Sequence, residues 1–208
     1  QPVAAFKNFK SFCSALKPLL SSNKEALEEL EKIENNFSKV MQEKMQNMWA
    51  SKLGLEKFDF ELFDELINIM IDTKVDYTIF FRELSNIPHD MSSLEKSFYA
   101  NLDNEKIKER WNSWLENWKS QINVNDEESK QKLSKQMKLT NPKYSLREWH
   151  LVWAYKEAEK GNYEPVQELQ EVMTKPYEEQ TKEIEEKYYI KKPSDFFGIA
   201  GISHVSCS

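Results

Sequence analysis

Apolar side chains recur at three- and four-residue steps through most of this chain, and this spacing restricts the fold more than any other feature. Such spacing places apolar groups on one face of an α-helix, whereas a half-buried strand needs strict alternation. The longest example lies within residues 22–54, where the apolar positions are Leu27, Leu30, Ile33, Phe37, Val40, Met41, Met45 and Met48. Neither a convincing alternating pattern nor an internal repeat is visible, so the sequence predicts an all-α fold.

The helices predicted by this pattern form an irregular bundle of about eight. Their expected ranges are 3–20, 22–54, 59–72, 76–86, 103–120, a short helix that ends near Thr140, 141–161 and 165–176. Asn141 and Pro142 are expected to begin the seventh helix, as its cap and first-turn proline. We expect one helical domain over 1–190, with any internal boundary near 88–102, and an extended irregular tail over 191–208.

Composition limits the classes of partner. The chain is 39% hydrophobic and 12% aromatic, which is sufficient for a packed core. It carries 29 Lys and Arg against 35 Asp and Glu, a net charge of −6, and this acidic balance argues against a nucleic-acid partner. No apolar stretch approaches the roughly 20 residues that cross a bilayer. We therefore expect neither a nucleic-acid nor a membrane partner.

Glycine is scarce, with four residues in the chain, at positions 54, 161, 198 and 201. Loops that hold phosphate groups need several closely spaced glycines, because backbone N–H groups must approach the phosphates. No such loop is present. The chain is therefore not expected to hold ATP or NAD by a Gly-rich loop.

Histidine and cysteine offer little catalytic or metal-binding chemistry. His89, His150 and His204 have no metal-ligand spacing to one another or to Cys13 and Cys207. A zinc site needs four ligands, or three and a water molecule, which the pair His204 and Cys207 does not supply. The same pair is a weak candidate for Cys/His hydrolysis, because it lies on a glycine-containing tail. We expect no metal site.

Aromatic, methionine and acidic patterns have structural interpretations. A stripe of Trp111, Trp114 and Trp118 has the spacing of a buried helix face rather than that of a base-stacking platform. Core packing also explains the methionines at 41, 45 and 48 better than a soft-metal site does. The acidic pairs are expected on solvated helix faces, without an acid/base couple among them; they are Asp59 with Glu61, Asp64 with Glu65, and Glu178 with Glu179.

One short segment combines several functional groups within seven residues. Asp76 is expected to cap a helix, followed by Phe80 and Phe81 in the core. Arg82 would then be free to pair with an acidic group. On its own, the segment predicts only a well-capped helix.

Several segments, taken in order, resemble the selenoprotein O family from the first residue of the chain to the last. The most recognisable is Asp76-Tyr77-Thr78 with Phe80-Phe81-Arg82 and Leu84. The others are Gln1-Pro2 with Asn8 and Pro18-Leu19-Leu20, Lys52-Leu53-Gly54-Leu55, Asn141-Pro142-Lys143-Tyr144 with Leu146-Arg147, Glu157-Ala158-Glu159-Lys160-Gly161-Asn162-Tyr163, Pro176-Tyr177, and Val205-Ser206-Cys207-Ser208. The chain departs from the family pattern at its end, which lacks a final Ser, and around Phe196-Phe197.

The resemblance implies a pseudokinase-like protein adenylyltransferase, which transfers AMP from ATP to hydroxyl groups of protein substrates. In the family, the residues that bind ATP and Mg²⁺ lie in a kinase-like core, which the family pattern places before Gln1. The resemblance therefore implies no catalytic or cofactor-binding residue in this chain, which alone is expected to be inactive. Its expected partners are its own kinase-like core and the protein substrates of the parent protein.

Cys207 is the single functional residue that the resemblance assigns. It occupies the position at which some family members have selenocysteine, which is linked to redox control. Cys13 is a poor substitute, because its helical, apolar setting predicts a buried thiol. A bacterial cytoplasm is expected, or mitochondria for a eukaryotic member.

Two other functions compete with this interpretation. The first is a free-standing helical interaction module. The second is a thiol redox protein that uses Cys207, which the absence of a Cys-x-x-Cys pair makes the weaker alternative.

Overall fold

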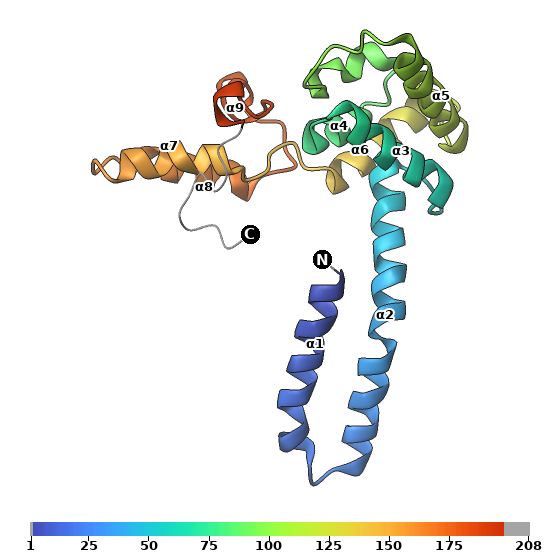
Figure 1. The fold of residues 1–208 in the computed structure, drawn as a ribbon, viewed down its shortest axis with the longest axis vertical. Helices are drawn as coiled ribbons and strands as arrows, with labels where there is room; N and C mark the ends of the chain where they lie inside the picture. The colour runs from blue at the N-terminus through green and yellow to red at the C-terminus, as the bar shows by residue number, and fades with distance from the viewer. Residues whose placement is uncertain (1, 198–208) are drawn as a thin grey trace. The chain divides into compact units, whose positions relative to one another are not determined.

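A computed structural model describes residues 2–197 of the chain, which fold into α-helices and short 3₁₀ helices (Figure 1). The prediction of an all-α fold is confirmed. The α-helices are α1 (Pro2–Leu16), α2 (Lys24–Leu53), α3 (Phe60–Thr73), α4 (Tyr77–Leu84), α5 (Glu105–Gln121), α6 (Glu127–Thr140), α7 (Glu148–Ala158), α8 (Glu164–Thr174) and α9 (Lys182–Tyr188). The 3₁₀ helices are η1 (Lys17–Leu20), η2 (Met91–Ser97) and η3 (Ser194–Phe196). Over residues 2–197, no helix is both long and apolar enough to cross a membrane.

The chain divides into two compact units, residues 1–49 and 50–208. In the first unit, α1 and most of α2 form an antiparallel hairpin joined through η1 (Figure 1). The ring of Phe37 packs against Phe6 and Phe9, with centroid distances of 5.5 and 4.7 Å. Cys13 on α1 is 1% exposed, as expected for a structural thiol. The expected domain division at residue 190 stays a prediction.

The predicted tryptophan stripe on α5 lies in the core of the second unit. Trp111 and Trp118 are each 0% exposed, and Trp114 is 3% exposed. Two of the indoles also tie helices together. Trp114 Nε1 donates to Leu62 O at 2.9 Å, and Trp118 Nε1 donates to Leu53 O at 2.7 Å. Burial on one helix face is therefore confirmed for this stripe.

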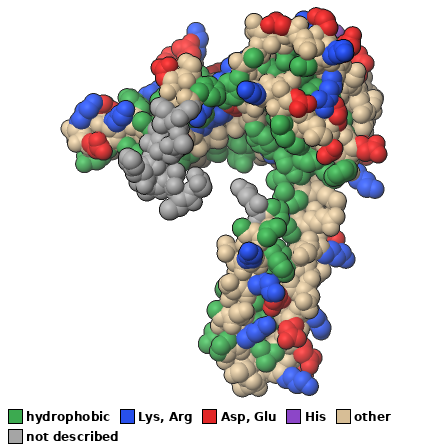
Figure 2. Space-filling view, in the orientation of Figure 1, with side chains coloured by type: hydrophobic (Ala, Val, Ile, Leu, Met, Phe, Trp, Pro, Cys, Tyr) green, Lys and Arg blue, Asp and Glu red, His purple; other side chains and the backbone are tan. Residues whose placement is uncertain are grey.

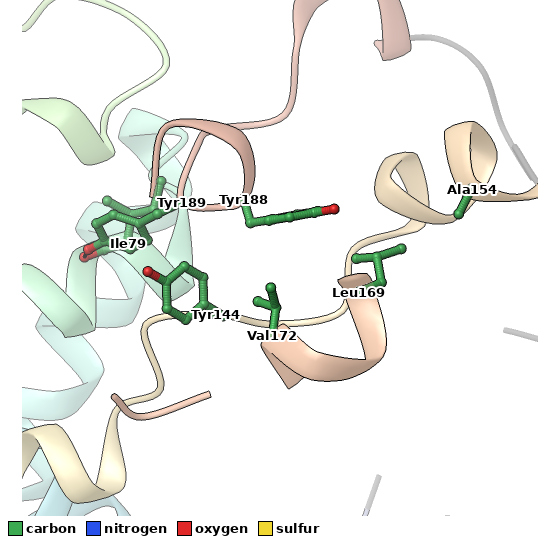
Figure 3. Close-up of a cluster of buried hydrophobic side chains, with 7 residues drawn as sticks. All are labelled: Ile79, Tyr144, Ala154, Leu169, Val172, Tyr188 and Tyr189. Carbon is green, nitrogen blue, oxygen red and sulfur yellow. Dashed lines mark hydrogen bonds between the residues drawn. The ribbon is translucent and has the colours of Figure 1, made fainter. Parts of the chain in front are cut away.

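A second apolar cluster of the same unit joins α4, α7, α8 and α9. Consecutive tyrosines at the end of α9 point to opposite sides of it (Figure 3). Tyr189 lies against Ile79 of α4, and its hydroxyl donates to Glu83 Oε1 at 2.6 Å. The ring of Tyr188 extends toward α8, where its hydroxyl donates to Glu168. The cluster therefore connects the C-terminal helices to α4.

Asn141 and Pro142 do not begin a helix, so this prediction was wrong. Asn141 follows the last residue of α6, and the next helix starts at Glu148. Between them, the backbone N–H groups of Lys143 and Tyr144 both donate to Pro176 O, at 2.8 and 3.1 Å. The segment is extended because its hydrogen bonds go to a distant turn instead of to a helical neighbour. The helix α9 was missed, and the stretch near Pro88 runs into η2.

Gly54 ends α2 through a Schellman motif, as its position in the sequence indicates. Leu55 N donates to Ala50 O at 2.9 Å and Gly54 N donates to Ser51 O at 3.3 Å. The φ angle of Gly54 is +68°, in the left-handed region. A Cβ atom added there would lie 2.7 Å from the sulfur of Met137. Only glycine fits this position without strain, because both the backbone angle and the space exclude a side chain.

Gly54→Ala is therefore expected to lower the free energy of unfolding by about 2–3 kcal/mol, from left-handed strain together with overpacking. The matched control is Gly161→Ala. Gly161 has a φ of +86°, but no heavy atom lies within 4 Å of an added Cβ. This control should lose about 1 kcal/mol, from strain alone. Urea unfolding monitored by tryptophan fluorescence measures the free energy of unfolding of both variants. Equal losses of this free energy would show that the side chain of Met137 moves away from the added Cβ at no cost.

Candidate functional site

Asp76, which the sequence singled out, is the centre of a buried ion pair. Its Oδ1 accepts from Ile79 N at 3.1 Å, which confirms the predicted cap of α4. Arg147 donates to both carboxylate oxygens, at 2.6 and 2.8 Å, and Tyr99 OH donates to Oδ2 at 3.0 Å. Burial would raise the pKa of Asp76, but the hydrogen bonds and charge of Arg147 outweigh it and hold the pKa below 3.8. Asp76 is therefore an ionised structural anchor.

Arg82 has the acidic partner that the sequence predicted, and three further acceptors. It is 2% exposed. Its guanidinium donates to Glu179 Oε1 at 2.7 Å, and to the carbonyl oxygens of Lys138, Asn141 and Tyr177 at 3.2, 3.0 and 3.1 Å. One side chain of α4 thus holds the end of α6 and the turn after α8, through charge-assisted hydrogen bonds.

Glu179 links Arg82 to a second cation. Lys143 donates to Glu179 and to Glu185 Oε2, the latter at 2.7 Å. Burial would raise the pKa of Glu179, but the hydrogen bonds and charges of Lys143 and Arg82 lower the pKa to about 2. The sequence prediction of a solvated face holds only in part here, because the side chain of Glu179 is 59% exposed but binds both cations.

Asn141 lies at the middle of this network, and both the nitrogen and the oxygen of its carboxamide form hydrogen bonds. Its Nδ2 donates to Lys52 O at 2.8 Å and to Ser85 Oγ at 3.0 Å, while its Oδ1 accepts from Lys52 Nζ at 2.9 Å. The ammonium of Lys52 also lies 5.0 Å from the ring centre of Phe81. Burial lowers the pKa of Lys52 to about 8. These bonds hold the start of the second unit against α4 and the end of α6.

The histidines do not come together as a site. The side chain of His89 is 98% exposed, whereas His150 is 6% exposed. His150 packs against Trp149 and Tyr188, and neither ring nitrogen has a hydrogen-bond partner within residues 2–197. Burial, and then the charge of Arg147, lower its pKa to about 4. His150 is therefore a neutral core histidine, while His204 lies outside the described residues.

Cys207, the predicted redox residue, also lies outside the described residues. Cys13 is buried, so it has little contact with solvent. Over residues 2–197, no group of three His, Cys, Asp or Glu side chains is arranged to hold a metal ion. The groups that sequence reasoning missed are Lys143, Arg147 and the pairing of Glu179. The sequence predicted a solvated position for Glu179 and an acidic partner for Arg82, but nothing in it joins these two residues.

The described residues thus form an all-α assembly in which buried charges bind one another and connect segments far apart in the sequence. The family described as protein adenylyltransferase SelO matches residues 1–174. The chain belongs to this family.

Curated relatives from three bacteria carry the name protein nucleotidyltransferase YdiU. The protein of Flavobacterium johnsoniae is 32% identical over 218 residues, which cover 100% of this chain and 40% of the relative. That of Tolumonas auensis is 28% identical over 214 residues, with the same coverage of each. That of Vibrio parahaemolyticus is 29% identical over 204 residues, or 94% of this chain and 39% of the relative. The chain therefore spans about 40% of the length of these relatives.

Proposed function

We propose that the chain is the helical part of a protein adenylyltransferase, which transfers AMP from ATP to hydroxyl side chains of protein substrates. The family match supports this class of enzyme. The name shared by the bacterial relatives supports transfer of a nucleotide to protein. ATP and Mg²⁺ would be bound by a kinase-like core that corresponds to the part of the relatives outside the match. The helices of this chain support that core and supply no ATP ligand.

The observation that carries the supporting role is an apolar groove on the α1–α2 hairpin. The groove has a volume of about 430 Å³. Most of its lining is apolar and comes from Pro2, Val3, Phe6, Phe37, Met41 and Met45. The hairpin also carries large side chains that are mostly exposed; they are Val3 at 70%, Phe12 at 58% and Leu19 at 77%. Figure 2 shows hydrophobic side chains along the hairpin surface.

A surface of this kind is costly in water. Each square ångström of apolar surface removed from water contributes about 25 cal/mol. Two helices that leave such side chains exposed gain little stability from their own contact, so a third surface is needed to cover them. More than half of each relative lies outside the match, and the kinase-like core in that part is the proposed cover.

Cys207 is the proposed redox residue of the parent protein. The resemblance of Val205-Ser206-Cys207-Ser208 to the family's terminal motif supports this role. The partner of the thiol would lie in the kinase-like core. The bacterial cytoplasm is the proposed location, in keeping with the bacterial relatives.

The test of the proposed function is AMP transfer measured by intact mass, with ATP and Mg²⁺. We expect no AMP on protein with the 208-residue chain alone. Transfer should occur with the full-length protein, or when a separately produced kinase-like core is added. AMP transfer by the chain alone would contradict the proposal, since the ATP site would then lie among residues assigned here to packing.

A pair of variants tests the groove. Val3→Glu adds a charge to the groove, whereas Ile71→Glu makes the same change on α3, where Ile71 is 69% exposed. The first should weaken binding of the separate core about tenfold or more, because a buried charge costs over 1.4 kcal/mol. The second should leave binding unchanged. If both variants bound the separate core with equal affinity, the groove would not be part of the interface.

A further inference from the structure

A polar cleft lies in the second unit between η2, residues 100–103 and the first half of α5. Its volume is about 890 Å³. This volume is within the range of ligand sites in proteins, about 300–1,000 Å³. Neither Asp76 nor Arg82 lines the cleft, which is therefore separate from the buried network described above. Tyr99 is the residue shared by the two, because it lines the cleft and donates to Asp76.

The backbone along one wall of the cleft has unpaired hydrogen-bonding groups. At the start of this wall, Phe98 forms an antiparallel bridge with Val75, and Tyr99 N donates to Lys74 O at 3.3 Å. Beyond Tyr99, the N–H and C=O groups of residues 100–103 have no hydrogen bond to any part of the chain within 2–197. Residues 100, 101 and 103 are exposed, and accessible backbone groups without an internal partner can pair with an added strand.

Three side chains of the cleft also have unused polar groups. Trp111 is 0% exposed, and its Nε1 donor has no acceptor in the described part of the chain. Such a buried donor is costly unless it is satisfied. The carboxamides of Asn101 and Asn112 line the cleft and are likewise unpaired within residues 2–197. A carboxamide both donates and accepts, which matches the two groups of a peptide bond.

The charges of the cleft do not favour a polyanion. Its charged lining residues are Lys96, Lys108, Lys191, Glu95 and Asp103. Lys96 is paired with Glu83 at 2.8 Å, and Lys108 with Glu105 at 3.0 Å. Lys191 is then the remaining cation of the lining, against the carboxylates of Glu95 and Asp103. No excess of positive charge remains to hold phosphate groups. The unused groups are instead neutral donors and acceptors.

We infer that this cleft binds an extended segment of a partner protein. The segment pairs with the backbone of residues 100–103, while Asn101, Asn112 and Trp111 bind its peptide groups. Recognition through peptide groups tolerates different side chains. The partner is therefore defined by an extended segment whose backbone N–H and C=O groups are not already hydrogen-bonded. This binding does not depend on the proposed nucleotide transfer.

The test begins with random dodecapeptides displayed on phage and selected on the immobilised 208-residue chain. Selected peptides are synthesised with a fluorophore, and their affinity is measured by fluorescence polarisation. Asn112→Ala should weaken binding about fivefold, the effect of losing one or two hydrogen bonds. Asn117→Ala is the control, since Asn117 is exposed on the same helix outside the cleft. The same peptide with N-methylated backbone amides should lose at least tenfold in affinity.

Amide NMR locates the binding. On addition of the peptide, the indole N–H signal of Trp111 and the amide signals of residues 100–103 should shift and saturate together. Either of two results would overturn the inference. One is that no selected peptide binds with a dissociation constant below about 100 μM. The other is that the shifts map to another surface, such as the hairpin groove, or that Asn112→Ala binds as well as Asn117→Ala.

Discussion

Asp76→Ala is expected to lower the free energy of unfolding of the second unit by about 4–6 kcal/mol. The loss of a helix cap contributes about 1 kcal/mol, and the removal of one partner of a buried ion pair contributes about 3–5 kcal/mol. Asp76 is 3% exposed, and the side chain of Arg147 is 13% exposed, so water replaces the lost carboxylate poorly. Tyr99 OH also loses its acceptor. The measurement is urea unfolding monitored by tryptophan fluorescence.

Two variants separate the cap from the ion pair. Asp76→Asn keeps a capping oxygen but removes the charge, so it should lose about 3 kcal/mol, close to the ion-pair share. Asp59→Ala is the control, because Asp59 caps α3 through Leu62 N at 2.9 Å and has no ion pair in the described residues. It should lose about 1 kcal/mol. Equal losses for Asp76→Ala and Asp59→Ala would mean that Arg147 contributes nothing to stability.

Helices were predictable because their signal is local. The apolar spacing in residues 22–54 predicted α2, and Gly54 marked its end correctly. The tryptophan stripe of α5 and the cap at Asp76 also depend on positions within one or two turns. Periodicity and capping read such positions directly.

The boundary at Asn141 could not be predicted for a physical reason. Asn followed by Pro is a common helix start, and no neighbour in the sequence contradicts it. The side chain of Asn141 instead binds Lys52 and Ser85, 89 and 56 residues away in the chain. A tertiary hydrogen-bond network thus takes precedence over a local capping preference.

The candidate site was predicted only in part, because its ion pairs also join residues far apart in the sequence. Arg82 was expected to find an acid, but the sequence contains 35 of them and does not indicate Glu179, which lies 97 residues away. The Asp76–Arg147 pair spans 71 residues. Pairings of this length arise from how helices pack, which single-sequence patterns do not encode. The redox role of Cys207 stays a prediction, because that residue lies outside the described range.

Arg82→Ala is expected to cost about 3–5 kcal/mol, the range for breaking a buried charged network. The side chain of Arg82 is 3% exposed, and its removal leaves three carbonyl oxygens without their donor. Each buried acceptor left without a partner costs about 1 kcal/mol or more. Most of the loss should therefore come from the carbonyl groups rather than from Glu179, whose side chain is 59% exposed and can be solvated.

Two further variants test that division. Glu179→Gln should cost only about 1 kcal/mol, because the exposed carboxylate is replaced by an amide of the same shape. Arg110→Ala is the matched control, since Arg110 pairs with Glu65 and Asp72 on the surface, with its side chain 36% exposed. Exposed pairs contribute up to about 1 kcal/mol. If Arg82→Ala lost no more than Arg110→Ala, then α4, α6 and the turn after α8 would be held by apolar packing alone, and the network would be a consequence of the fold instead of one of its causes.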